Sequence, residues 1–79
     1  MNSRDRYISI FEKVFGANPD ELNADYTVTN VKNWDSMSHI LLINELEDTF
    51  DLMMDSDDII EFDSFEKGIE ILKKYEVEI

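Results

Sequence analysis

The sequence predicts an all-α fold: a small four-helix bundle with three longer helices, a short third helix and a long loop between the first and second. Apolar residues recur at helical spacing in three separate stretches. The 79 residues include only two glycines and one proline, too few for a turn-rich β protein. Because domains usually have about 50–250 residues, we expect residues 1–79 to form a single domain.

The first helix is predicted from about Ser3 to Phe15. Ser3 is the expected N-cap, and Gly16 suits the left-handed exit. The apolar residues that recur at helical spacing are Tyr7, Ile8, Phe11, Val14 and Phe15.

No helical period holds from Ala17 to Asp35, where Pro19 and several β-branched residues oppose a helix. Loops of this length are uncommon in small domains and are often functional. We expect its large apolar side chains to attach the loop to the core. These are Leu22, Tyr26, Val28, Val31 and Trp34.

The stretch from Ser36 to Phe50 gives the strongest helical signal, and Asp35 suits its N-cap. At 100° per residue, His39 falls in the core-facing arc, whereas Ser36 lies well round the helix. The apolar members of the core arc are Leu42, Ile43, Leu46 and Phe50, with Ile40 at its edge. The opposite arc holds Met37, Leu41, Asn44, Glu45 and Asp48.

A short link, Asp51 to Met54, leads to two further predicted helices. Asp55 is expected to cap a short helix that runs to about Phe62, with Asp57 and Asp58 favourable to its dipole. An Asp-Ser-Phe-Glu capping pattern then starts at Asp63 and opens the last helix. Its apolar face is predicted to hold Phe65, Ile69, Leu72 and Tyr75, with Lys73 and Lys74 in the final turn.

The charge balance of 7 basic and 19 acidic residues gives −12 at pH 7. Nucleic acid and anionic membrane surfaces would repel such a chain, whereas partners with basic docking patches would be attracted. Between Asn33 and Glu66 there is no Lys or Arg, but there are eleven acids. Because these acids repel one another, we expect salt or millimolar divalent cations to raise the melting temperature.

The chain has no cysteine, which excludes disulfides, thiolate metal sites and a cysteine nucleophile. Residues Met1 to Asp5 show no long apolar run or small-residue cleavage site, so we expect no secretory signal. No stretch approaches the roughly 18 apolar residues of a membrane span. We therefore expect a monomer in the reducing cytoplasm, without membrane insertion.

The many carboxylates suggest a calcium site of the EF-hand type. Starting at Asp55, acids fall at positions 1, 3 and 12, but Ile59 and Ile60 occupy a ligand position and the glycine turn. The acids therefore indicate a solvated face with capping residues, and we expect no specific metal site.

Ser36 and His39 lie three residues apart, but the nucleophile elbow of a serine hydrolase is absent. A histidine on a core-facing arc is more often a packed or boundary residue, so we expect no catalysis by the chain itself. Ser36 at a helix N-terminus also suits modification by a phosphate, which the free N–H groups and the dipole would stabilise. On spacing alone, this interpretation and that of a good first-turn residue stay equally open.

The run Trp34-Asp35-Ser36-Met37-Ser38-His39-Ile40 resembles the Asp-Ser-Leu attachment motif of acyl carrier proteins and the related peptidyl carriers. The similarity continues to Phe50 through Leu41-Leu42-Ile43-Asn44-Glu45-Leu46-Glu47-Asp48-Thr49-Phe50, which resembles the second helix of that family. In outline it covers the whole chain, including its length, its acidity and the order of its helices.

The resemblance implies that a phosphopantetheinyl transferase (holo-ACP synthase) moves 4′-phosphopantetheine from coenzyme A onto Ser36. The thiol of the arm would carry an acyl or aminoacyl thioester to acyl-loading, condensing and acyltransfer enzymes of fatty-acid, polyketide or related biosynthesis. The alternative is a peptidyl or aminoacyl carrier of nonribosomal-peptide or cell-surface-modification pathways. The expected partner-binding residues are Asp35, Met37, Leu41, Asn44, Glu45 and Asp48.

The resemblance implies a space between the helices that could shelter a fatty chain, but here aromatic residues are expected to leave little room. The residues that could line such a space are Phe11, Leu42, Leu46, Phe50, Phe62, Phe65, Ile69 and Leu72.

Several positions depart from the fatty-acid type of carrier. Asn33-Trp34 precedes Asp35-Ser36 where that type commonly has Gly-x, Asp51 replaces the glycine often found after the helix, and Leu41 stands where an acid is frequent. Met53-Met54 replaces the usual Ile-Pro. These departures favour a specialised stand-alone carrier.

Overall fold

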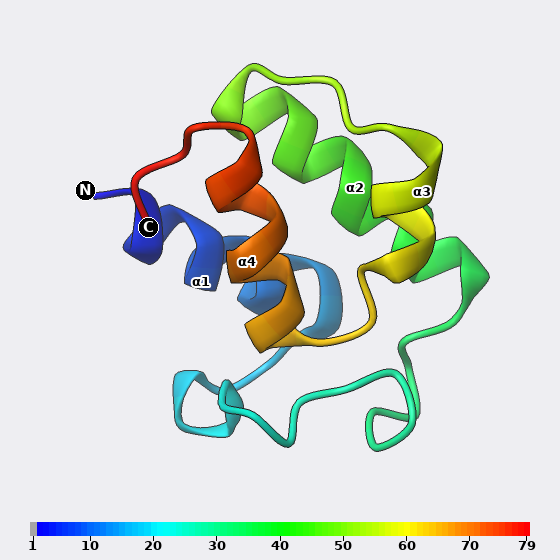
Figure 1. Ribbon diagram of the computed structural model, residues 1–79. Helices are drawn as coiled ribbons and strands as arrows, with labels where there is room; N and C mark the ends of the chain where they lie inside the picture. The colour runs from blue at the N-terminus through cyan, green and yellow to red at the C-terminus, as the bar shows by residue number, and fades with distance from the viewer. Residues whose placement is uncertain (1) are drawn as a thin grey trace.

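The computed structural model describes residues 2–79, and over this range the chain forms α-helices and no β-strand (Figure 1). The elements in order are α1 (Ser3–Phe15), the 3-10 helix η1 (Pro19–Glu21), α2 (Ser36–Phe50), α3 (Ser56–Glu61) and α4 (Phe65–Lys74). The all-α class, the short third helix and the long loop after α1 are thus confirmed. Within that loop, η1 is a short helical turn that the sequence did not predict. Met1, part of the segment inspected for a signal, lies outside the described residues.

Two of the predicted N-caps are wrong by one residue. Asn2, not Ser3, caps α1, because its side-chain oxygen accepts a main-chain N–H three residues on at 2.8 Å. Ser64, not Asp63, caps α4 in the same way at 3.0 Å. Asp55 stands at the N-cap of α3 but makes no side-chain capping bond. The left-handed exit of α1 at Gly16, with φ of 65°, is confirmed.

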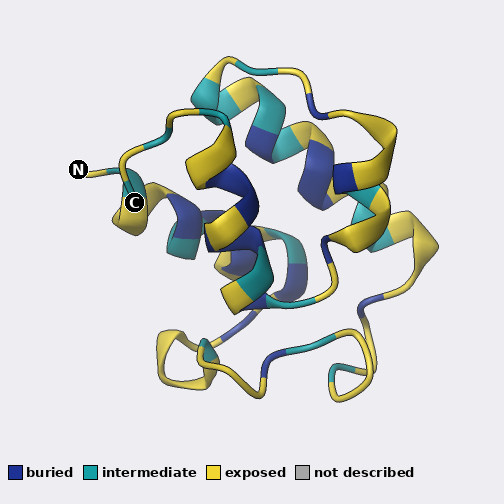
Figure 2. Ribbon diagram, in the orientation of Figure 1, coloured by how far each residue is buried: buried dark blue, intermediate teal, exposed yellow. Residues whose placement is uncertain are grey.

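The core is an aromatic cluster centred on Phe11, which is fully buried. Its ring centroid lies between 5.0 and 5.8 Å from those of Tyr7, Tyr26, Trp34 and Phe65. Figure 2 shows the buried residues on the inward sides of α1, α2 and α4. Of the residues considered above as a lining for a fatty chain, all are buried except Phe50, which is half-buried against the core.

The long loop is attached to the core as predicted by Tyr26 and Trp34, which are buried, and by Leu22 and Val31, which are half-buried. The prediction for Val28 is wrong, because its side chain is exposed. A main-chain bond holds this residue instead: its N–H donates to the Asp63 carbonyl at 2.9 Å. Together with the bridge between residues 27 and 64, this bond ties the loop to the α3–α4 connection.

Asp58 lies in the first turn of α3, as predicted, but it is buried, with 3% of its surface exposed. Its carboxylate accepts from Lys74 Nζ at 2.6 Å and from the Tyr75 hydroxyl at 2.5 Å. The Tyr75 oxygen in turn accepts the Asp55 N–H at 2.9 Å. The hydrogen bond from Lys74, followed by that from Tyr75, lowers the pKa of Asp58. This cluster of Asp58, Lys74 and Tyr75, the ionic clamp, fastens α3 to the end of α4.

Candidate functional site

Ser36 is the first residue of α2, and its side chain is exposed. The preceding Asp35 is the predicted N-cap: its Oδ1 accepts the Ser38 N–H at 3.0 Å. The Asp35 N–H donates to the Ser38 hydroxyl at 2.9 Å, which completes a reciprocal capping box. Ser38, rather than Ser36, therefore supplies the hydroxyl that the helix start requires.

The capping box also fixes the charge of Asp35. The Ser38 backbone N–H and then the Ser38 hydroxyl lower the pKa of the Asp35 carboxyl, so the capping box favours its ionised form. The 15-residue helix presents its first N–H groups and the positive end of its dipole at Ser36. A phosphate on this hydroxyl would meet favourable electrostatics from its own helix.

A groove of about 360 Å³ opens beside Ser36. One wall comes from the long loop, one from the start of α2, and one from α3 and the link that follows it. The lining residues are Val28, Trp34, Asp35, Ser36, His39, Ile60, Phe62 and Asp63.

His39 is half-buried in this groove, which agrees with its prediction as a packed or boundary residue. Its Nδ1 lies 3.0 Å from Trp34 Nε1, and its Nε2 lies 2.8 Å from the Ile59 carbonyl oxygen. Both ring nitrogens are thus engaged, and neither is directed at Ser36. In this arrangement His39 is not placed to act as a general base for Ser36.

The predicted partner-binding arc of α2 is largely accessible. Met37 is 72% exposed, and Leu41, Asn44 and Asp48 are exposed as well. Glu45 differs, because it is half-buried and forms a salt bridge with Lys13 of α1 at 3.1 Å.

Two further apolar side chains extend the exposed surface near Ser36. Ile40 was expected at the edge of the core, but it is 59% exposed because the bundle leaves that side of the first turns of α2 open. Ile60 of α3 is 77% exposed and lines the groove. Sequence reasoning missed Ile60, since a six-residue helix is too short for its period to separate inner from outer residues.

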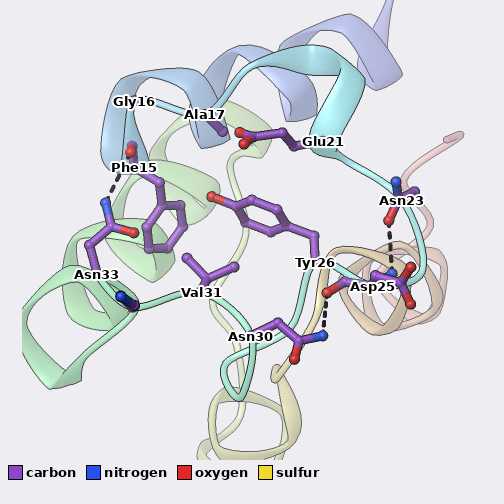
Figure 3. Close-up of a pocket in the computed structure, with 11 residues that line it drawn as sticks. Phe15, Gly16, Ala17, Glu21, Asn23, Asp25, Tyr26, Asn30, Val31 and Asn33 are labelled. Atoms are coloured by element: carbon purple, nitrogen blue, oxygen red, sulfur yellow. Dashed lines mark hydrogen bonds between the residues drawn. The ribbon is translucent and has the colours of Figure 1, made fainter.

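A larger hollow of about 510 Å³ lies under the long loop, away from Ser36 (Figure 3). Its amide side chains are used to shape the loop: Asn33 donates to the Phe15 carbonyl at 3.0 Å, and Asn30 to the Asp25 carbonyl at 2.9 Å. The polar groups of this hollow thus serve the fold of the loop. The groove beside Ser36 is the candidate site.

Within residues 2–79 no cluster of three or more histidine or acidic side chains is arranged to hold a metal ion. Ile59 and Ile60, which interrupt the EF-hand pattern, lie inside α3. Across the same described range, no helix combines the length and apolarity needed to cross a membrane.

Comparison of the chain with protein-family models, curated proteins and solved structures gave no match. The assignment of a function therefore depends on the chain's own residues and their arrangement.

Proposed function

We propose that this chain is a carrier protein of the acyl-carrier type, with Ser36 as the attachment site of 4′-phosphopantetheine. The observation that carries the proposal is that the two serines at the start of α2 differ in role. Ser38 completes the capping box, whereas Ser36 is exposed at the same helix start. A residue released from the structural role is available for modification.

The chemistry of loading is a phosphoryl transfer from coenzyme A. The Ser36 hydroxyl oxygen forms a bond to the phosphorus that bears pantetheine, and the pyrophosphate bridge of coenzyme A breaks. Adenosine 3′,5′-bisphosphate leaves, and the serine proton passes to a base of the transferase. The terminal thiol of the arm then carries an acyl or aminoacyl group as a thioester, which explains how a chain without cysteine can do so.

The surface around Ser36 supports docking by enzymes with basic patches. Met37 and Leu41 supply exposed apolar contacts, and Asp35 and Asp48 supply negative charge beside them. Complementary charge of this kind speeds association and selects partners, whereas a few apolar anchors supply the binding energy. The departures at Leu41 and Asp51 favour a specialised cytoplasmic carrier over the core fatty-acid type.

The test is the intact mass of the protein after incubation with coenzyme A and a broad-specificity phosphopantetheinyl transferase. We expect the wild type and Ser38→Ala to gain one phosphopantetheine, and Ser36→Ala to gain none. Ser38→Ala should lower the free energy of unfolding by about 0.5–1.5 kcal/mol, because it loses a capping hydrogen bond. Ser36→Ala should leave it nearly unchanged.

Loading of Ser36→Ala would show that the site is wrong. A folded wild type that neither this enzyme nor a holo-ACP synthase can load would contradict the carrier function. Partner binding that persists without Ser36 would instead indicate an acidic adaptor.

A further inference from the structure

The hydrogen bonds of His39 define its tautomer. An indole N–H can only donate, so His39 Nδ1 must be the acceptor in the bond from Trp34. A carbonyl oxygen can only accept, so Nε2 must carry the proton in the bond to Ile59. Both bonds form only with the neutral ring protonated on Nε2, since a proton on Nδ1 would face the indole N–H.

α3 depends on external contacts for its position. It has six residues, and isolated helices of that length are not stable in water. Its N-cap residue Asp55 contributes no side-chain bond. The Ile59 carbonyl belongs to the last turn, where carbonyls lack a partner inside the helix, and His39 supplies the missing donor.

The segments joined by His39 also supply the apolar walls beside Ser36. Trp34 belongs to the long loop, which carries the exposed Val28, and Ile59 belongs to α3, which carries the exposed Ile60. Trp34 and His39 are stacked at 28° with ring centroids 6.2 Å apart. One turn along α2 from Ser36, a single side chain thus touches both neighbouring walls of the groove.

We propose that His39 is the positioning residue of the Ser36 site. As the neutral Nε2–H tautomer, it holds the end of the long loop at Trp34 and the last turn of α3 against α2, and so places Ile60 on the surface that the loading enzyme meets at Ser36. This inference rests on the proposed function for its link to loading, whereas the bridge itself can be measured without any enzyme.

The two hydrogen bonds of His39, to Trp34 and to Ile59, form the His39 bridge. The first measurements of this bridge are nitrogen NMR of the imidazole and tryptophan fluorescence. His39 is the sole histidine and Trp34 the sole tryptophan, so both signals are unambiguous. We expect the proton of the neutral ring on Nε2. A proton on Nδ1, or a ring that exchanges freely between tautomers, would overturn the proposal.

Substitutions at the two side chains separate hydrogen bonding from packing. His39→Leu fills the space but removes both bonds, whereas the Gln side chain of His39→Gln can accept from Trp34 and donate to Ile59. Trp34→Phe removes the indole donor together with part of the buried ring. For His39→Leu we expect amide exchange at Ile59 to rise about tenfold and KM for loading of Ser36 to rise about tenfold, with kcat little changed. For His39→Gln, both the amide exchange at Ile59 and the KM for loading should stay within about threefold of the wild type. For Trp34→Phe, both values should lie between those of His39→Gln and His39→Leu.

The outcomes distinguish this inference from the proposed function. A wild type that is never loaded overturns the carrier function and, with it, the role of His39 in loading. A loaded wild type with His39→Leu loaded equally well overturns the role of His39 alone. Equal losses in His39→Leu and His39→Gln, with both variants folded by circular dichroism, would show that the imidazole acts by packing and would also overturn it.

Discussion

α4 is held by two contrasting sets of contacts, one toward α1 and one toward α3. Toward α1 the contacts are aromatic and buried: the Tyr7 hydroxyl donates to the Phe65 carbonyl at 2.7 Å, and the two rings lie 4.9 Å apart. Toward α3 the contact is the ionic clamp, in which Lys74 stays 61% exposed at its side chain while Asp58 is buried. The buried contacts of Tyr7 with Phe65 between α1 and α4, called the aromatic seam below, depend on close packing. The ionic clamp between α3 and α4 depends on charge.

The difference indicates which part of the molecule responds to solution conditions. A close-packed aromatic seam has no group that titrates near neutral pH, and burial raises the pKa of Tyr7 well above its usual value. The ionic clamp loses an attraction whenever Asp58, Lys74 or Tyr75 changes its protonation state. α3, which lines the groove at Ser36, is therefore held in part by a contact that depends on charge.

The largest effect is expected in the aromatic seam, from Gly68→Ala. A Cβ at Gly68 would lie 2.1 Å from the Tyr7 hydroxyl oxygen and 2.3 Å from a ring carbon of Phe62. Alanine favours the helix by about 1 kcal/mol, but overpacking costs about 1–3 kcal/mol. Loss of the buried Tyr7–Phe65 bond costs about 1–3 kcal/mol more. We expect the free energy of unfolding to fall by about 3 kcal/mol, as measured by urea denaturation.

Gly16→Ala is the matched control, because a Cβ there meets nothing within 4 Å. Its cost comes only from the positive φ of 65°, about 1 kcal/mol. Equal losses at the two glycines would show that the seam can relax around a methyl group.

Asp58→Asn, which removes the charge at the centre of the ionic clamp, should cause a smaller loss of stability than Gly68→Ala, and that loss should depend on pH. The pKa of Asp58 is lowered from 3.8, so the clamp stabilises fully above that value and weakens as pH falls through the lower folded-state pKa. Asp58 raises the pKa of Lys74 above 10.5 and of Tyr75 above 10.0 by hydrogen bonding. Their contribution is complete below those values and is lost as pH rises through the higher folded-state pKa values.

Thermal melts of the wild type and Asp58→Asn should therefore differ most, and by a constant amount, from about pH 5 to pH 9. The difference should shrink at both extremes. For Gly68→Ala the loss should not vary across the same range. A clamp effect that grew toward acid would contradict the assigned pairing.

The sequence predicts what is local in this fold. Periodicity and caps place α1 and α2 within a residue, because amphipathic spacing and turn residues act over a few positions. The pairing of Asp58 with Lys74, sixteen residues away, has no local signal. The exposure of Ile40 and Val28 was missed for the same reason, since it depends on which elements pack beside them.

The predicted places of Ser36 in the first turn of α2 and of Asp35 at its N-cap are confirmed. The capping role of Ser38 was not foreseen, although a hydroxyl three residues after an N-cap could have indicated it. The His39 bridge needs the loop and α3 to meet on α2, which no spacing within the sequence encodes.

A smaller change in the free energy of unfolding is expected at Asp51, which belongs neither to the aromatic seam nor to the ionic clamp. Asp51 ends α2 in the left-handed region with φ of 53°, where glycine is favoured, and its negative charge lies at the unfavourable end of the helix dipole. We expect Asp51→Gly to raise the free energy of unfolding by about 0.5–1 kcal/mol, measured by urea denaturation. Asp51→Asn removes the charge alone and should recover part of the gain. A loss of stability in both variants would mean that the carboxylate makes a favourable contact.

The smallest effect is expected at the exposed counterpart of the ionic clamp, the salt bridge of Lys13 with Glu45 between α1 and α2. Lys13 is 69% exposed at its side chain, so the pair should contribute about 0.2–1 kcal/mol at low salt. We expect Lys13→Gln to lower the melting temperature slightly in low salt and to match the wild type near 1 M salt, where screening acts within about 3 Å.

The wild type itself should melt higher as salt is added, because a net charge of −12 makes repulsion outweigh its ion pairs. A wild-type melting temperature that falls with salt would show that ion pairs, the clamp of α3 foremost, exceed the repulsion. In that case the charge-dependent seam would contribute more to stability than its partly exposed geometry indicates. The stabilities contributed by the aromatic seam and the ionic clamp would then have to be compared at high salt, where charge interactions are screened and packing is left.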